Sequence, residues 1–248
     1  MRLIKKFFWF LIDFIVPPRC LMCQSMIVTP GHLCAACWSN LSFISRPYCE
    51  QCGFPFDYTI QEDMRCGSCI TKPPKYRKAR SVLVYDDVSK LLILKFKHGD
   101  GTYLTPAFTD WMLIAGTELF ESADYLIPVP LHWKRLLRRR YNQAALLTQG
   151  LAQKTKKPAL LNALTRIRNT PSQGHLTHKE RDQNVRKAFA LKPKFASLLK
   201  DKRVVLIDDV MTSGSTLQAC TRALLKHGVA TVDVLTLARV AAPKIISK

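Results

Sequence analysis

The sequence predicts an α/β fold, in which a doubly wound and mostly parallel sheet follows an N-terminal cysteine-rich module. Two observations carry this prediction. After residue 80, short apolar runs alternate with helical patterns, which is typical of a parallel sheet with helices on both faces. Before residue 70, eight cysteines form four Cys-x-x-Cys pairs, which is the spacing of zinc-binding turns. We expect an apolar helix over 1–19, the cysteine module over 20–78 and the α/β domain over 79–248.

The charge of the chain indicates an anionic partner. Among 248 residues, 38 are Lys or Arg and 18 are Asp or Glu, which gives a formal charge of +20. The charge stays strongly positive if the cysteines bind zinc as thiolates. Such a balance favours nucleic acid, phosphorylated metabolites or an anionic membrane surface, and it does not separate DNA from RNA.

The N-terminal helix expected over 1–19 is apolar from Phe7 to Val16, except for Asp13. This run is too short to span a bilayer, and no signal-peptidase site follows it. We favour a helix packed on the body of the protein, because a polar face is nearly absent. The alternative is an interfacial helix that associates weakly with a membrane. We therefore expect a cytoplasmic protein, with peripheral membrane contact as the alternative.

The four cysteine pairs predict two zinc sites, because two Cys-x-x-Cys turns complete one tetrahedron of thiolates. A disulfide scaffold would need an oxidising compartment, and the chain carries no secretion signal. The sequential pairing assigns Cys20, Cys23, Cys34 and Cys37 to one ion, and Cys49, Cys52, Cys66 and Cys69 to the other. Spacing alone leaves an interleaved arrangement open. Gly31 and Gly53 fit the turns, and Cys220 is expected to be a small core residue.

The module ends in a basic, Pro-containing stretch over 70–80, which we expect to be a solvated linker, or else a strip that contacts phosphate. The elements expected beyond it are strands at 81–85, 125–130, 160–164, 189–191, 204–207 and 231–238, and helices at 88–96, 105–120, 142–154 and 217–227. The polar stretch 165–187 is long for a loop and rich in anion-binding side chains. We expect it to be a lid.

A sugar-phosphate site is predicted where the strand 204–207 ends. Asp208 and Asp209 follow this strand, and a turn of hydroxyl residues and Gly214 then leads into a helix. Backbone N–H groups at such a turn and at a helix N-terminus bind phosphate, and glycine lets the backbone approach closely. The carboxylates suit ribose hydroxyls or hydrated Mg²⁺. Neither a Walker loop nor the three-glycine dinucleotide pattern is present.

A second anion-binding segment is predicted after the strand 125–130. Five Lys and Arg residues lie between 134 and 140, directly after that strand. The carboxyl edge of an open parallel sheet is where such folds bind ligands, so this cluster is placed to neutralise a pyrophosphate. The alternative is a solvated helix face.

These motifs resemble those of the ComF family, also called ComFC or GntX-like proteins. The acidic pair and its turn are similar to the phosphoribosyl pyrophosphate (PRPP) motif of type I phosphoribosyltransferases, and the resemblance extends over nearly the whole chain. Further matching segments are Leu94–Lys97 with Gly99–Asp100, Pro128–His132, Arg139–Gln143, Arg168 with Gln173, and Glu180–Arg181 with Asn184–Val185 leading to Phe189. The chain departs from the family at Arg140, where the family prefers Gly, which puts the backbone shape there in question.

The resemblance implies a double zinc ribbon followed by a domain of type I phosphoribosyltransferase fold. By resemblance, Asp208 and Asp209 hold the ribose hydroxyls with Mg²⁺, and the turn cradles the 5′-phosphate through Thr212, Ser213, Gly214, Ser215 and Thr216. The pyrophosphate loop contains Leu131, His132, Lys134 and Arg135. The flexible loop and basic site contain Arg139, Asn142, Gln143, Arg168, Gln173, Arg181 and Asn184.

The family is linked to natural competence, so the resemblance implies a protein of natural transformation that binds PRPP and single-stranded DNA. Other competence or DNA-processing proteins are expected as partners. Two alternatives remain at this point: a phosphoribosyltransferase that acts on an unidentified acceptor base, and a regulator that senses PRPP without catalysis. None of the histidines is assigned a catalytic role.

Overall fold

The computed structural model describes residues 17–57, 64–98, 101–132, 136–137, 139–167 and 188–241. The helix expected over 1–19 lies almost entirely outside the described residues. Most of the expected lid over 165–187 lies outside them as well. Among the described residues, no helix is long and apolar enough to cross a membrane.

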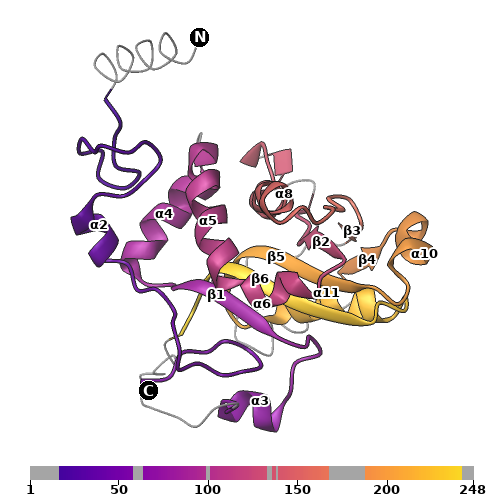
Figure 1. The fold of residues 1–248 in the computed structure, drawn as a ribbon. Coiled ribbons are helices and arrows are strands. Elements are labelled where there is room, and N and C mark those ends of the chain that lie inside the picture. The colour runs from indigo at the N-terminus through magenta and orange to yellow at the C-terminus, as the bar shows by residue number, and fades with distance from the viewer. Residues whose placement is uncertain are drawn as a thin grey trace.

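The α/β prediction is confirmed by a four-stranded sheet in the order β1-β6-β5-β2 (Figure 1). Its strands are β1 (Ala79–Val84), β2 (Tyr125–Pro128), β5 (Arg203–Met211) and β6 (Thr231–Arg239). Every pair in this sheet is parallel. A separate antiparallel pair is formed by β3 (Leu164–Arg166) and β4 (Phe189–Leu191). The run Val204–Ile207 is at most 1% exposed, as expected for a strand covered on both faces.

Two short helices precede β1 in the cysteine module, and the other helices lie between successive strands. The helices are α2 (Ala35–Ser39), α3 (Gly67–Thr71), α4 (Asp87–Lys97), α5 (Thr105–Ala115), α6 (Thr117–Glu121), α8 (Gln143–Thr155), α10 (Ala196–Leu199) and α11 (Ser215–Leu225), with 3₁₀ turns η1 (Gly101–Leu104) and η3 (Pro193–Phe195). Local sequence explains the start of α4, where Asp86 and Ser89 form a capping box.

The two faces of the sheet carry different layers. Helices α4, α5 and α8 pack on one face, where Phe96 and Phe108 share a core with Val205. On the opposite face, α11 packs together with the second group of cysteines, and Cys52 belongs to the same core as Leu206. Figure 1 shows α4, α5 and α8 on one side of the sheet and α3 on the other. The second cysteine group is therefore part of the core of the α/β domain.

The chain between the two cysteine groups covers the outer edge of β1. Ile44 donates its backbone N–H to the carbonyl of Val82 at 2.8 Å, and Val84 donates to Ser42 at 2.9 Å. These bonds pair residues 42–44 with an edge strand that would otherwise present unpaired backbone groups. The cysteine module is thereby joined to the sheet by main-chain contacts as well as by side chains.

The expectation of a solvated linker over 70–80 is wrong for its last residues. Arg77 makes a two-point contact with the buried carboxylate of Asp233, through Nε at 3.0 Å and Nη2 at 2.5 Å. Lys78 pairs with both Glu50 and Glu118, at 2.6 and 2.8 Å. The side chain of Arg80, only 3% exposed, pairs with the same two glutamates. These cations attach the cysteine module to the sheet.

Three further boundaries differ from the sequence prediction. The strand β5 continues through the acidic pair to Met211, because β6 pairs with it as far as that residue. The helix expected over 105–120 is divided into α5 and α6 at Gly116, where a Cβ atom would lie 2.7 Å from Leu235 Cδ2. The strand expected at 160–164 is instead β3, whose position is set by pairing with β4.

Gly53 tests the contact between the second cysteine group and the sheet. Its φ is +68°, and a Cβ atom there would lie 2.6 Å from the carbonyl oxygen of Ala79, the first residue of β1. Gly31 has φ +76° but nothing within 4 Å, so it is a matched control. In urea unfolding of the zinc-loaded protein, we expect Gly53→Ala to lose about 3 kcal/mol and Gly31→Ala about 1 kcal/mol. Equal losses would contradict this account of the contact.

Candidate functional site

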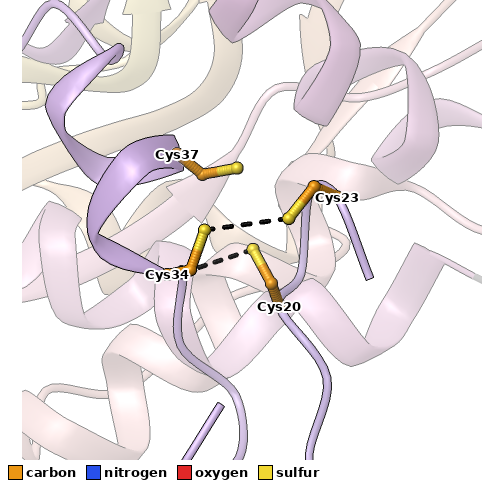
Figure 2. Close-up of side chains that lie close together, drawn as sticks. All are labelled: Cys20, Cys23, Cys34 and Cys37. Atoms are coloured by element: carbon orange, nitrogen blue, oxygen red, sulfur yellow. Dashed lines mark hydrogen bonds between the residues drawn. The ribbon is translucent and has the colours of Figure 1, made fainter. Parts of the chain in front are cut away.

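Two clusters of four cysteines have the geometry of zinc sites. The sulfur atoms of each cluster lie within 4.8 Å of one another, and the clusters are Cys20, Cys23, Cys34 and Cys37, and Cys49, Cys52, Cys66 and Cys69. Figure 2 shows the first four side chains close together. The Sγ atoms of Cys23 and Cys34 are 3.7 Å apart. Sulfurs bound at 2.3 Å around a tetrahedral ion lie about 3.8 Å apart, so each cluster fits one zinc ion. The sequential pairing is confirmed.

Hydrogen bonds favour the thiolate form that binds metal. The backbone N–H of Cys34 donates to Cys20 Sγ at 3.3 Å, and that of Cys66 donates to Cys49 Sγ at 3.2 Å. Ser25 Oγ lies 3.1 Å from Cys23 Sγ, and hydrogen bonds from the Ser25 side chain and backbone, together with those from Cys20 and Cys37, lower the pKa of Cys23 to about 6. Because thiolates rather than thiols are ligands, such contacts prepare the clusters for zinc.

Each cysteine cluster also offers a backbone carbonyl to a cation of the α/β domain. Lys95 Nζ on α4 donates to the carbonyl of Met22, between the first two cysteines, at 2.7 Å. Arg239, at the end of β6 and 5% exposed, donates Nη1 to the carbonyl of Cys52. Arg239 stands opposite Met211 in the register of β5 and β6. Both clusters therefore contact segments next to the acidic pair.

The acidic pair lies within β5 near the carboxyl edge of the sheet. Asp209 Oδ2 forms an ion pair with Lys97 Nζ at 3.0 Å, and both side chains are largely buried. The backbone N–H of Asp209 donates to Asp208 Oδ1 at 2.8 Å. Burial and the neighbouring charge of Asp209 raise the pKa of Asp208 to about 8. Lys97 was not among the expected site residues, although it ends the segment Leu94–Lys97 that resembles the family.

The predicted phosphate turn joins β5 directly to α11. Gly214 precedes the helix with φ +73°, as expected for a turn that needs glycine. The hydroxyls of Ser213 and Ser215 are 2.9 Å apart. Because α11 begins at Ser215, the positive end of its dipole lies at this turn. The structure thus brings the acidic pair and the turn together at one edge of the sheet.

The predicted pyrophosphate loop is described only in part. Leu131 and His132 follow β2 at the same edge, where Val129 donates its backbone N–H to Ile207 at 2.9 Å. His132 is 5% exposed. Lys134 and Arg135 lie outside the described residues, as do Arg168, Gln173, Arg181 and Asn184.

Two residues predicted for the basic site make internal contacts that shape this edge. The side chain of Asn142 caps α8 by accepting the N–H of Ala144 at 3.1 Å, and it donates to the carbonyl of Val129 at 3.2 Å. Gln143, 1% exposed, donates to the carbonyls of Phe96 and Lys97 at 3.4 and 3.3 Å. Gln143 therefore fixes the end of α4 that carries Lys97.

The departure from the family at Arg140 coincides with an unusual backbone. Arg140 has φ +66°, in the left-handed region that glycine adopts without steric cost. The neighbouring Arg139 donates Nη1 to Gln143 Oε1 at 3.4 Å. The backbone shape that a glycine would favour is thus kept here by an arginine.

Comparison with known proteins agrees with this architecture. Residues 11–70 match the double zinc ribbon domain family, and residues 150–245 match the phosphoribosyl transferase domain family. Over 89% of its length the chain is 34% identical to Competence protein F of Haemophilus influenzae, of which it covers 96%. It is 30% identical to DNA utilization protein YhgH of Escherichia coli K12, in an alignment that covers 90% of this chain and 98% of that protein. It is 27% identical to Competence protein ComFC of Bacillus subtilis, in an alignment that covers 89% of this chain and 94% of that protein. The α/β domain has the type I phosphoribosyltransferase fold.

The two cysteine clusters are expected to bind zinc independently, one ion each. We expect two zinc ions per chain in the wild type, and about one in either Cys34→Ser or Cys66→Ser, since each change removes one of four ligands. Cys220→Ser is the matched control and should keep both ions, because Cys220 lies in the core outside both clusters. Mass spectrometry of the metal content after chelator washing measures this. Loss of both ions in Cys34→Ser would contradict independent sites.

The raised pKa of Asp208 predicts that stability falls as the pH rises. The unfolded chain releases this proton near pH 4, whereas the folded protein keeps it to about pH 8. Between these values the folded state binds more protons, so the contribution of Asp208 to stability decreases with rising pH. Denaturation at pH 5, 7 and 9, without Mg²⁺ or ligand, should show a steeper decline for the wild type than for Asp208→Asn. Parallel curves would show that the group does not titrate in this range.

Proposed function

This chain belongs to the family of Competence protein F and DNA utilization protein YhgH, and on that basis we propose that it binds PRPP and single-stranded DNA and acts in natural transformation. The observation that carries the PRPP part is the acidic pair, with its lysine, beside a hydroxyl turn at the start of α11. Carboxylates and a phosphate-binding turn at one sheet edge match the two ends of a ribose 5-phosphate.

Each group of this edge has a distinct part in binding. Asp208 and Asp209 accept hydrogen bonds from the ribose hydroxyls, and together they would hold a hydrated Mg²⁺ ion. The turn Thr212–Thr216 donates to the 5′-phosphate. Lys134 and Arg135 would neutralise the pyrophosphate. When bound, Mg²⁺ supplies further positive charge to the pyrophosphate.

The DNA part of the proposal is supported by charge and by the relatives. A formal charge of +20 favours binding to a polyanion, and one relative carries the name DNA utilization protein. Affinity for single strands should fall steeply as salt rises, because phosphate contacts release counterions. We propose other competence or DNA-processing proteins as partners in this role.

Transfer of the phosphoribosyl group to an acceptor base is the second candidate, favoured because the acidic pair and the phosphate turn are both intact. Release of pyrophosphate would then depend on electrostatic stabilisation of the leaving group by the basic loop. Pyrophosphate release that requires one particular base would establish this activity. PRPP binding without release would instead favour a regulator.

Calorimetric titration of PRPP with Mg²⁺ into the zinc-loaded protein tests the first candidate. We expect Asp208→Asn/Asp209→Asn to weaken binding at least about hundredfold, because the ribose and metal contacts lose their charge, and to leave two zinc ions in place. The matched control is Asp110→Asn/Glu121→Gln, which removes two exposed carboxylates, one in the middle of α5 and one at the end of α6 before β2 begins, and should bind as the wild type does. A wild-type protein that gives no heat with PRPP would refute the proposal.

A further inference from the structure

A group of cations lies at the amino edge of the sheet, at the opposite ends of the strands from the acidic pair. We call it the amino-edge group, and its members are Lys156, Lys157, Lys194, Lys200, Lys202, Arg203 and Lys226. Five of them are exposed, and Lys157 and Lys202 are half-buried. They come from the end of α8, from η3 and the loop after α10, from the start of β5 and from the residue after α11.

Main-chain contacts bring these segments side by side. Asp201 donates its backbone N–H to Gly228 at 2.8 Å, and Ala230 donates to Lys202 at 2.9 Å, so the loop before β6 lies against the start of β5. On the other side, Asp124 donates to Arg203 at 2.8 Å. Figure 1 shows α10 at this end of the molecule, away from α2 and α3.

The segment that follows α8 completes the row. Leu126 of β2 donates its backbone N–H to Pro158 at 3.0 Å, which places Lys157 beside the first residues of β2. Neighbouring strands lie about 4.8 Å apart, so the starts of β6, β5 and β2 span about 10 Å. The cations therefore form a row across three strands.

The charges of this row are not balanced within the protein. In the described part of the chain, no ion pair includes a member of the amino-edge group. The carboxylates in the same segments are Asp124 and Asp201, and Asp124 is engaged with the backbone N–H of Arg203 at 2.8 Å. The seven cations outnumber these two carboxylates, so their like charges repel one another, and an anionic partner relieves this repulsion.

We infer that the amino-edge group binds the phosphate backbone of single-stranded DNA, so that the DNA lies at the sheet edge opposite the PRPP site. The inference rests on the proposed function and assigns its DNA part to particular residues. A row of separated cations, without a carboxylate pair or a hydroxyl turn, matches a repeating polyanion better than one pyrophosphate.

The location is tested by fluorescence anisotropy with a labelled 20-nucleotide oligo(dT) across a salt series. Lys200→Gln/Lys202→Gln/Lys226→Gln should weaken binding at least about tenfold at low salt. The slope of log K against log salt should fall by about 2, since each lost single-strand contact contributes about 0.7. The matched control Arg65→Gln/Lys75→Gln/Lys90→Gln removes three exposed cations elsewhere and should retain affinity within about twofold. Excess PRPP with Mg²⁺ should not displace the oligonucleotide from the wild type.

The outcomes separate this inference from the function on which it rests. If the wild type binds oligo(dT) and the amino-edge variant binds equally well, the location is overturned and the proposed DNA binding stands. If the wild type does not bind, the DNA part of the proposed function fails and the location fails with it. An equal loss in the control variant, or displacement by PRPP, would also overturn the location. PRPP titration of the amino-edge variant should match the wild type, which shows that the variant is folded.

Discussion

The carboxyl edge of the sheet, which carries Asp208 and Asp209, depends on two contacts with the zinc module. In each contact, a cysteine cluster offers a backbone carbonyl to a cation of the α/β domain. The carbonyl of Met22 accepts from Lys95, and the carbonyl of Cys52 accepts from Arg239. A zinc ion fixes the backbone of a Cys-x-x-Cys turn, so it also fixes the direction of these carbonyls. Lys95 lies on the same helix as Lys97, the partner of Asp209. The zinc module therefore helps to position the residues around the candidate PRPP site.

Ion pairs also join the cysteine module to the sheet. Glu50 lies inside the third Cys-x-x-Cys turn, between Cys49 and Cys52, yet it accepts hydrogen bonds from Lys78 and Arg80 at the start of β1. Asp233 is buried and is satisfied by Arg77 and by the backbone N–H of Lys78. Removing one partner of such a group leaves a buried charge uncompensated, which is costly. The boundary between the two domains is consequently a tightly bonded interface.

What the sequence predicted well was local in origin. Four Cys-x-x-Cys pairs, the turn positions of Gly31, Gly53 and Gly214, and the strand–turn–helix around the acidic pair depend on neighbouring residues alone. What it missed depends on partners far along the chain. The strand β5 extends past Ile207 because β6 pairs with it, and Arg77 is bound by a carboxylate 156 residues away. Lys97 meets Asp209 from the end of a different element, α4, where Gln143 donates to its backbone carbonyl.

The two carboxylates of the acidic pair face different surroundings, and the alternation of a strand explains the difference. Successive side chains of β5 point to opposite faces, so Leu206 packs with α11 and Ile207 packs with α4 and α5. Asp209 lies on the same face of β5 as Ile207 and forms its ion pair with Lys97 on α4. Asp208 lies on the same face as Leu206 and near Cys220 on α11, where burial, and Asp208 once it is ionised, raise the pKa of the Cys220 thiol. One carboxylate thus has a fixed cation, whereas the other keeps its proton through burial. A cation that binds beside Asp208 lowers the pKa of this carboxyl, so that it loses its proton and becomes charged. Asp208 is therefore the member of the pair whose charge changes when a cation binds.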